Sequence, residues 1–196
     1  MESNLIMTRP LTSSFLSCDK DTERILRKLL IISKPYSDEL KRLLVINTKD
    51  CLDDKTNPIY LKKLEEMTLP RLIDDGYIKL APKIRLPEHA EVKSYIILTF
   101  DNFTPNRTNP QFRDCLINFD IVCHTDYWDI GDYRLRPLKI AGYIDGLLNN
   151  TKLTGIGTVQ FAGCNELILS ENLSGYTLMY KTIHGSDDQI PDPKVE

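Results

Sequence analysis

The residues of this sequence that are best suited to chemistry lie close together, in the stretch FDIVCHTDYW at 119–128. Cys123 and His124 are neighbours there, and a thiolate activated by an imidazole is a common nucleophile when the two side chains come within hydrogen-bonding reach. Asp120, His124 and Asp126 are evenly spaced, so in an extended chain they would share one face. Two carboxylates and an imidazole on one face are a candidate site for a hydrolase or a nuclease, for which metal binding is the test.

A period of two in the surrounding residues decides whether Cys123 and His124 can act together. Five apolar residues alternate along the chain and share one face of a strand: Cys115, Ile117, Phe119, Ile121 and Cys123. Adjacent residues of a strand point to opposite faces, so the thiol and the imidazole cannot converge on one substrate atom. We therefore predict that Cys123 is a small core residue and that His124 lies on the more polar face. The hydrolase or nuclease alternative needs only that second face and stays open.

Other groups of reactive residues lack the spacing that their chemistry requires. Asp126, Asp129 and Asp132 recur every third residue, whereas a calcium loop takes its ligands from alternate positions and ends in a glutamate. The five cysteines include no C-x-x-C pair, and the sequence has no glycine-rich phosphate loop and no H-E-x-x-H motif. We predict loop and helix-start positions for the aspartates, and a protein with no catalytic residues, no bound metal and no cofactor.

The composition is that of an ordinary globular chain, since 196 residues, 41% hydrophobic and 27% charged, are enough for one core. The formal net charge of −3 argues against a surface that neutralises many phosphates, so nucleic acid is not expected as a tightly held ligand. No apolar run reaches the roughly 18 residues of a membrane span. An odd number of cysteines, with no secretory signal at the N-terminus, predicts reduced thiols in a cytosolic compartment.

The elements that would hold these residues change character near residue 92. Before it, a period of 3.6 predicts helices at 19–33, from Ser37 onward and at 58–67, with Pro70 as an interruption. After it, a period of two predicts strands, broken once by a helix with an apolar face. The predicted strands are 92–103, 111–125, 157–169 and 175–184, and the predicted helix is 137–149.

This order of elements predicts an α+β fold, with a mostly antiparallel four-stranded sheet and helix 137–149 across one face, in the order β-β-α-β-β. A helical N-terminal region at 19–91 would pack on the sheet. An N-terminal arm at 1–18 and a C-terminal extension at 187–196 would flank the core at 92–186. The residues predicted to be buried in that core are Ile117, Phe119, Ile121, Ile144, Leu148 and Leu178.

Two conspicuous segments are not explained by the core: the loop FTPNRTNP at 103–110 and the turn at 126–136. The loop is too long for a tight hairpin turn and should protrude. The aromatic residues of the turn, together with Tyr143, either cap the core or form a subunit contact, because Tyr, Trp and Arg are enriched at interface centres. The predicted contact residues are Thr104, Asn106, Arg107, Asn109, Tyr127, Trp128, Tyr133, Arg134 and Arg136.

The second half of the chain, about 92–190, carries a recognisable succession of motifs. A long strand ends in FDIVCHTDYW, the segment DYRLRP leads into the amphipathic helix LKIAGYIDGLLNN, and a hairpin that opens with G-x-G follows. This succession resembles the tail terminator, or tail-completion, proteins of long-tailed bacteriophages. The resemblance implies a β-β-α-β-β sheet with the helix on one face, in a structural protein of the virion neck that forms a six-fold ring.

The resemblance also implies a set of partners. The ring would terminate the tail tube and join it to the head connector, so its partners would be other copies of itself in a hexamer, the tail tube protein and a head-completion or connector protein. DNA would only pass through the lumen, no membrane would take part, and the protein would assemble in the host cytoplasm and reside in the virion. The alternatives are a head-closure or adaptor protein of the connector, a small phage-encoded hydrolase or nuclease, and a host-directed binding module.

Overall fold

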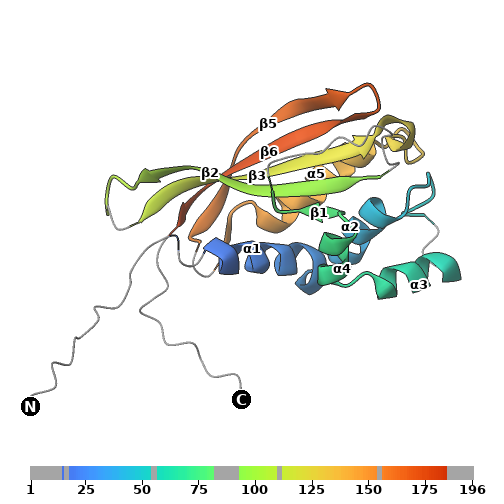
Figure 1. Ribbon diagram of the computed structural model, residues 1–196, viewed down its shortest axis with the longest axis horizontal. Helices are drawn as coiled ribbons and strands as arrows, with labels where there is room; N and C mark the ends of the chain where they lie inside the picture. The colour runs from blue at the N-terminus through green and yellow to red at the C-terminus, as the bar shows by residue number, and fades with distance from the viewer. Residues whose placement is uncertain are drawn as a thin grey trace, which may run out of the picture.

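The fold is given by a computed structural model, which describes residues 15, 18–53, 57–81, 93–109, 112–153 and 156–184. Within these residues a six-stranded sheet has the order β1-β2-β3-β6-β5-β4 (Figure 1). Its four long strands are β2 (Tyr95–Pro105), β3 (Arg113–His124), β5 (Thr158–Ser170) and β6 (Leu173–His184). The two short strands are β1 (Ile78–Lys79) and β4 (Thr151–Lys152). The predicted arm at 1–18, apart from residues 15 and 18, and the extension at 187–196 lie outside the described residues.

The pairing confirms the predicted α+β class and the mostly antiparallel sheet. β1 runs parallel to β2, and the other neighbouring strands are antiparallel. The prediction of four strands is wrong, because β1 and β4 add a strand to each side of the sheet. Each has two residues, which is too short a run to show a period in the sequence.

Most helices precede the long strands, and between β3 and β5 lie a short 3-10 helix (Thr125–Tyr127) and one α-helix. The longer helical elements are α1 (Cys18–Arg27), a π-helical turn (Lys28–Ile32), α2 (Tyr36–Val45), α3 (Pro58–Glu66), α4 (Leu69–Asp74) and α5 (Arg136–Leu148). Asn57 caps α3, where its side chain accepts a 3.0 Å hydrogen bond from the backbone N–H of Ile59. The prediction that Pro70 interrupts the helices is wrong. Pro70 lies in the first turn of α4, where the missing N–H has no intrahelical partner to lose.

The main hydrophobic core lies between the sheet and the helices, which gather on one face of the sheet (Figure 1). α5 contacts β3 and β6 directly, and α2 packs against α5. The ring of Phe119 meets that of Tyr180 edge-on at 5.9 Å between centroids, in the middle of this core. The predicted buried set is confirmed for all its members: Ile117, Phe119, Ile121, Ile144, Leu148 and Leu178.

A smaller apolar cluster closes one end of the opposite face of the sheet. Its buried members are Tyr95, Ile97, Val122 and Leu173, and Leu167 and Leu169 of β5 pack against them. Lys79 lies over the Tyr95 ring, 3.8 Å from its centroid. This cluster explains why the end of β3 is buried on both faces, although its sequence alternates in polarity only up to that point.

Candidate functional site

The turn at 126–136 is fixed to the helical layer by Arg136. Its guanidinium is fully buried and donates hydrogen bonds to four backbone carbonyls: Tyr127 O through Nε (2.8 Å), Leu43 O (2.6 Å) and Ile46 O (2.9 Å) through Nη1, and Thr48 O (2.7 Å) through Nη2. A charged group is stable in the interior only when its donors are satisfied in this way. Arg136 therefore holds α5, α2 and the turn together, and its side chain is not available to a partner.

The outer part of the turn is held by ion pairs to the loop that follows α2. Arg134 Nη2 lies 2.9 Å from the carboxylate of Asp53, and Lys49 Nζ lies 2.9 Å from that of Asp129. The hydrogen bond from Lys49 lowers the pKa of Asp129. Tyr133 projects from this framework with a fully exposed side chain and a left-handed backbone, φ 60°. The turn thus presents Tyr133 to solvent on a backbone that these contacts hold in place.

The aromatic residues of the turn, together with Tyr143 of α5, divide between two roles. Trp128 is half-buried and packs against the main core, with its ring 6.3 Å from that of Tyr176. Tyr143 also packs against the core and donates its hydroxyl hydrogen bond to Glu39, and burial together with that carboxylate raises the pKa of Tyr143. Core capping therefore describes Trp128 and Tyr143, whereas Tyr133 faces outward.

The tip of the β2–β3 hairpin is the second predicted contact segment. Asn106 orders it: its side-chain oxygen accepts from the backbone N–H of Thr108 (3.0 Å) and Asn109 (3.1 Å), and its Nδ2 donates to Asp114 at 2.7 Å. Thr104, Arg107 and Asn109 are exposed beside it. β2 continues to Pro105 and β3 begins at Arg113, so the loop begins and ends later than the predicted 103–110.

An open hollow of about 700 Å³ lies beside this tip and reaches the start of β3. Arg107 and Lys181 bring positive charge to its rim, and Asp114 and Asn106 contribute polar oxygen atoms. The two predicted contact segments therefore belong to different parts of the sheet. The hairpin tip lies at the end of β2 where β3 begins, and the turn lies at the other end of β3 (Figure 1).

The hydrolase or nuclease alternative requires Asp120, His124 and Asp126 to converge. His124 Nδ1 accepts a 3.3 Å hydrogen bond from the backbone N–H of Asp126 and lies 3.5 Å from its carboxylate, whereas Asp120 accepts from the hydroxyl of Thr177 at 2.6 Å. Asp120 and His124 are four residues apart on an extended strand, which separates their backbones by about 13 Å. Among the described residues no group of three or more His, Cys, Asp or Glu side chains could hold a metal ion.

The placement of His124 on a polar face needs correction, because the side chain is buried. The apolar cluster around Tyr95 and Leu173 closes that face at the end of β3. Cys123, on the opposite face, is fully buried as predicted, and burial raises its thiol pKa to about 11.

A buried contact between a histidine and a carboxylate at the end of β6 was not predicted. His184 Nδ1 lies 2.7 Å from Asp21 Oδ2, both side chains are almost completely buried, and Arg24 Nη1 contacts the other carboxylate oxygen at 2.9 Å. The pair joins α1 to the last residue of β6. No sequence signal could have found it, because the two residues are 163 positions apart and each stands among polar residues.

In the part of the chain that the structure describes, no helix is long and apolar enough to cross a membrane. No curated protein matches the chain. A family model named YomW matches residues 37–182, which is well over half of the sequence. The match extends from α2 to β6 and omits only the first residue of α2 and the last two residues of β6. The chain therefore belongs to the YomW family, a phage-type protein family.

Proposed function

We propose that this member of the YomW family is a structural protein of the phage neck. In this proposal it forms a homo-oligomeric, six-fold ring that terminates the tail tube and joins it to the head connector. Its partners would be the tail tube protein on one side and a head-completion or connector protein on the other. The phage type of the family supports a function in a phage, and the architecture of the core supports the role as a ring subunit of the neck.

The observation that carries the proposal is the unit β2-β3-α5-β5-β6, which lies almost wholly inside the family match. It has the order of elements that the tail terminator resemblance implies, with α5 on one face of the sheet. Its connections, rather than its core, carry exposed polar and aromatic side chains. A ring subunit needs such a stable core with separate contact surfaces at its ends.

The two contact surfaces would act in different ways. The turn at 126–136 is anchored to the helical layer by the buried hydrogen bonds of Arg136, and it presents Tyr133 outward. The hairpin tip presents Thr104, Arg107 and Asn109 beside an open hollow. A head-to-tail ring contact requires two different surfaces of this kind on each subunit.

Electron microscopy of particles from cells that lack this protein tests the proposal. The expected result is full heads beside unjoined or over-long tails. Heads that have lost their DNA would favour the head-closure alternative instead. Normal virions with intact necks would contradict any neck role and would favour a host-directed binding module.

Complementation with surface variants then tests the ring contacts. Tyr133→Ser and Arg107→Ala alter exposed side chains, so the chain should fold normally but should not restore joined particles. Tyr36→Ser is the matched control, since Tyr36 is an exposed tyrosine on the helical layer. Restoration by Tyr133→Ser and Arg107→Ala as complete as that by Tyr36→Ser would contradict these two surfaces as contacts.

A further inference from the structure

The outer edge of β5 is open along most of its length. On its inner side β5 pairs with β6 from Gln160 to Ser170. On its outer side β4 pairs with Thr158 and Val159, and no described residue pairs beyond them. The N–H of Phe161 donates to the side-chain oxygen of Asn149 at 3.0 Å. The backbone groups that point outward from 162 to 170 have no strand partner within the described chain. Unpaired N–H and C=O groups in a row are a template for another strand.

The sequence of this edge lacks the devices that normally keep edge strands apart. From 160 to 170 it reads QFAGCNELILS, with Glu166 as its one charged residue and without lysine or proline. Lysine, proline and inward-pointing charges are the usual protection of a free edge. Two register shifts interrupt the pairing with β6, at 161/163 and at 168/170, which leaves 163–168 as a regular run.

The opposite edge of the sheet, on β2, is protected. β1 covers it at Ile96 and Ile97. Beyond them Asp101 adds a charge, Asn102 takes a left-handed backbone (φ 54°), the register shifts before Thr104, and the strand ends at Pro105. The two edges of one sheet thus differ: β2 combines a charge, a left-handed residue, a register shift and a proline, whereas β5 has register shifts only at the two ends of its regular run 163–168.

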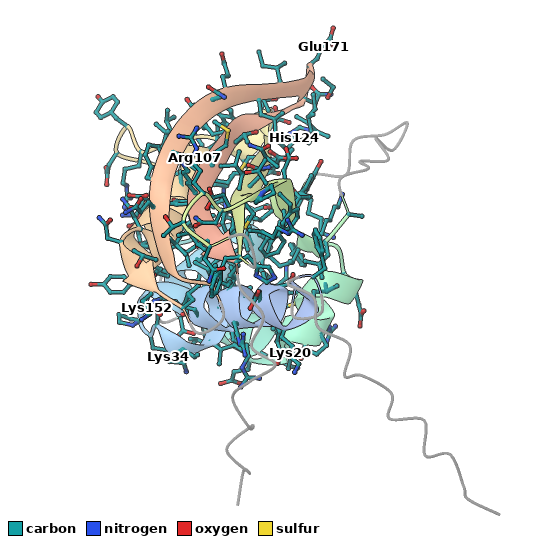
Figure 2. The ribbon with its side chains drawn as sticks, turned by 90° about the vertical axis from the view of Figure 1, so that its left-hand side faces the viewer. Lys20, Lys34, Arg107, His124, Lys152 and Glu171 are labelled. Carbon is teal, nitrogen blue, oxygen red and sulfur yellow. The ribbon has the colours of Figure 1, made fainter. Side chains whose placement is uncertain are left out.

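Both faces of β5 are also poorly covered. Phe161 is 46% exposed and Ile168 is 69% exposed, and most residues of the strand are exposed, although Leu167 and Leu169 pack against the small apolar cluster. Figure 2 shows the β5–β6 hairpin curling away from the helical layer, with Glu171 at its tip and Lys20 and Lys34 on the far side of the molecule. A partner strand on β5 would cover apolar side chains that the chain itself leaves in solvent.

We infer that the β5 edge is a dimerisation surface, on which β5 of a second copy of this chain pairs antiparallel about a two-fold axis. A strand partner must offer a free edge as long and as regular as β5. The β2 edge does not, so the second copy's own β5 is the described segment that fits. In the regular run 163–168 the backbone groups of every second residue point outward, those of Cys164 and Glu166 among them. About an axis in the middle of the run these two residues of each copy oppose each other, which gives about four main-chain hydrogen bonds across the axis.

The axis passes near Asn165, the middle of the open edge. Directly opposed residues of an antiparallel pair point to the same face, so the two Asn165 side chains face each other across the axis. The two Cys164 residues then become diagonal neighbours, with Cβ atoms somewhat less than about 7–8 Å apart. The two Glu166 carboxylates occupy the other diagonal and repel each other. Cys164 is exposed, which makes it a natural reporter of this geometry.

This contact produces a dimer and no larger assembly, because the two-fold arrangement leaves no β5 edge free on either copy. It does not rest on the neck proposal, and it uses neither the hairpin tip nor the turn at 126–136. A subunit could therefore make the two-fold contact and the ring contacts at once. The particle experiment and the dimer experiment can fail independently.

Sedimentation equilibrium of the purified full-length protein tests the dimer with charge variants. Asn165→Glu places like charges directly opposite each other and should raise the dimer dissociation constant by roughly tenfold. Glu166→Gln removes the diagonal repulsion and should lower it. The matched controls are Asn172→Glu and Glu171→Gln, which make the same changes at exposed turn residues outside the edge and should leave dimerisation unchanged. A monomer at every concentration would overturn the inference, and so would equal effects of Asn165→Glu and Asn172→Glu.

Thiol cross-linking separates the two-fold arrangement from any other dimer. Cys51, Cys115 and Cys123 are buried, so a short bismaleimide added to the folded Cys18→Ser protein can link only Cys164. A covalent dimer that disappears in Cys164→Ser is the expected result. If the protein dimerises but Cys164 does not cross-link, the contact lies elsewhere and the inference fails. Circular dichroism of each variant establishes that the chain remains folded.

Discussion

β3 and β5 are strands of almost equal length, 12 and 13 residues, but they have opposite environments. β3 lies between β2 and β6 with α5 across one face, and its last four residues are buried on both faces. β5 pairs with one long strand, and Val159 is its one fully buried residue. The burial of a strand therefore depends more on its position in the sheet than on the number of apolar residues in its sequence.

The difference assigns separate tasks to the two strands. β3 contributes to the stability of the single chain, because its side chains join the sheet to the helical layer. β5 adds little to that core and leaves its edge and its apolar side chains available. Matched substitutions in the two strands should therefore give very different results.

A phenylalanine in each strand provides the largest expected contrast. Phe119→Ala removes a fully buried ring from the core and should lower the free energy of unfolding by about 3–5 kcal/mol. Phe161→Ala removes a half-exposed ring and should cost less than about 1 kcal/mol. Urea unfolding at low protein concentration, followed by circular dichroism, measures both changes. Equal losses in the two variants would contradict the assignment of β3 to the core and β5 to the surface.

Two glycines give the second contrast, one opposite β3 and the other within β5. Gly175 pairs with Val122 of β3, and a Cβ at this position would lie 1.8 Å from the carbonyl oxygen of Ile121. The backbone must move to accept it, so Gly175→Ala should destabilise the fold by about 3 kcal/mol. Gly163 of β5 would meet only the flexible end of Met179, at 3.1 Å.

Gly163→Ala should therefore change the free energy of unfolding by less than about 1 kcal/mol, because a methionine side chain can move away. The same urea titration compares the two glycine variants. If Gly163→Ala proves the more damaging of the pair, then the register shift at 161/163 needs a glycine and β5 is less tolerant than its exposure indicates.

The main elements of the fold could be predicted because each is long enough to show a period. The four long strands and α5 have apolar residues in regular alternation or on one helical face, and the structure confirms them. β1 and β4 could not be predicted from two residues each. The order of strands is also absent from the pattern, so the sequence does not show that β6 lies beside β3 and that β5 is left at the edge.

The contact segments show the same limit. That Tyr133 is exposed and Arg136 is buried cannot be told from DYRLRP, where both residues are of types common at interfaces. Arg136 is buried because backbone carbonyls near residues 43–48 converge on it, about 90 positions away in the chain. Every residue has a backbone carbonyl, so the sequence does not show which carbonyls will accept a hydrogen bond from a buried arginine. His124 was misplaced for a similar reason, since most of the apolar cluster on its face of the sheet comes from other strands.

The cysteines of the two strands give the smallest and most local contrast. Cys123 of β3 is fully buried, and burial raises its pKa to about 11 from 9.0, which leaves about a hundredfold less thiolate at neutral pH. Cys164 of β5 is exposed, although partial desolvation also raises its pKa.

In the Cys18→Ser background, a maleimide should therefore modify one thiol in a fast phase that Cys164→Ser abolishes. Cys123 should react only when the chain opens, so its rate should rise in Phe119→Ala while the rate of Cys164 stays the same. A fast phase that survives Cys164→Ser would show that a thiol of the core is accessible, and it would break the contrast between β3 and β5.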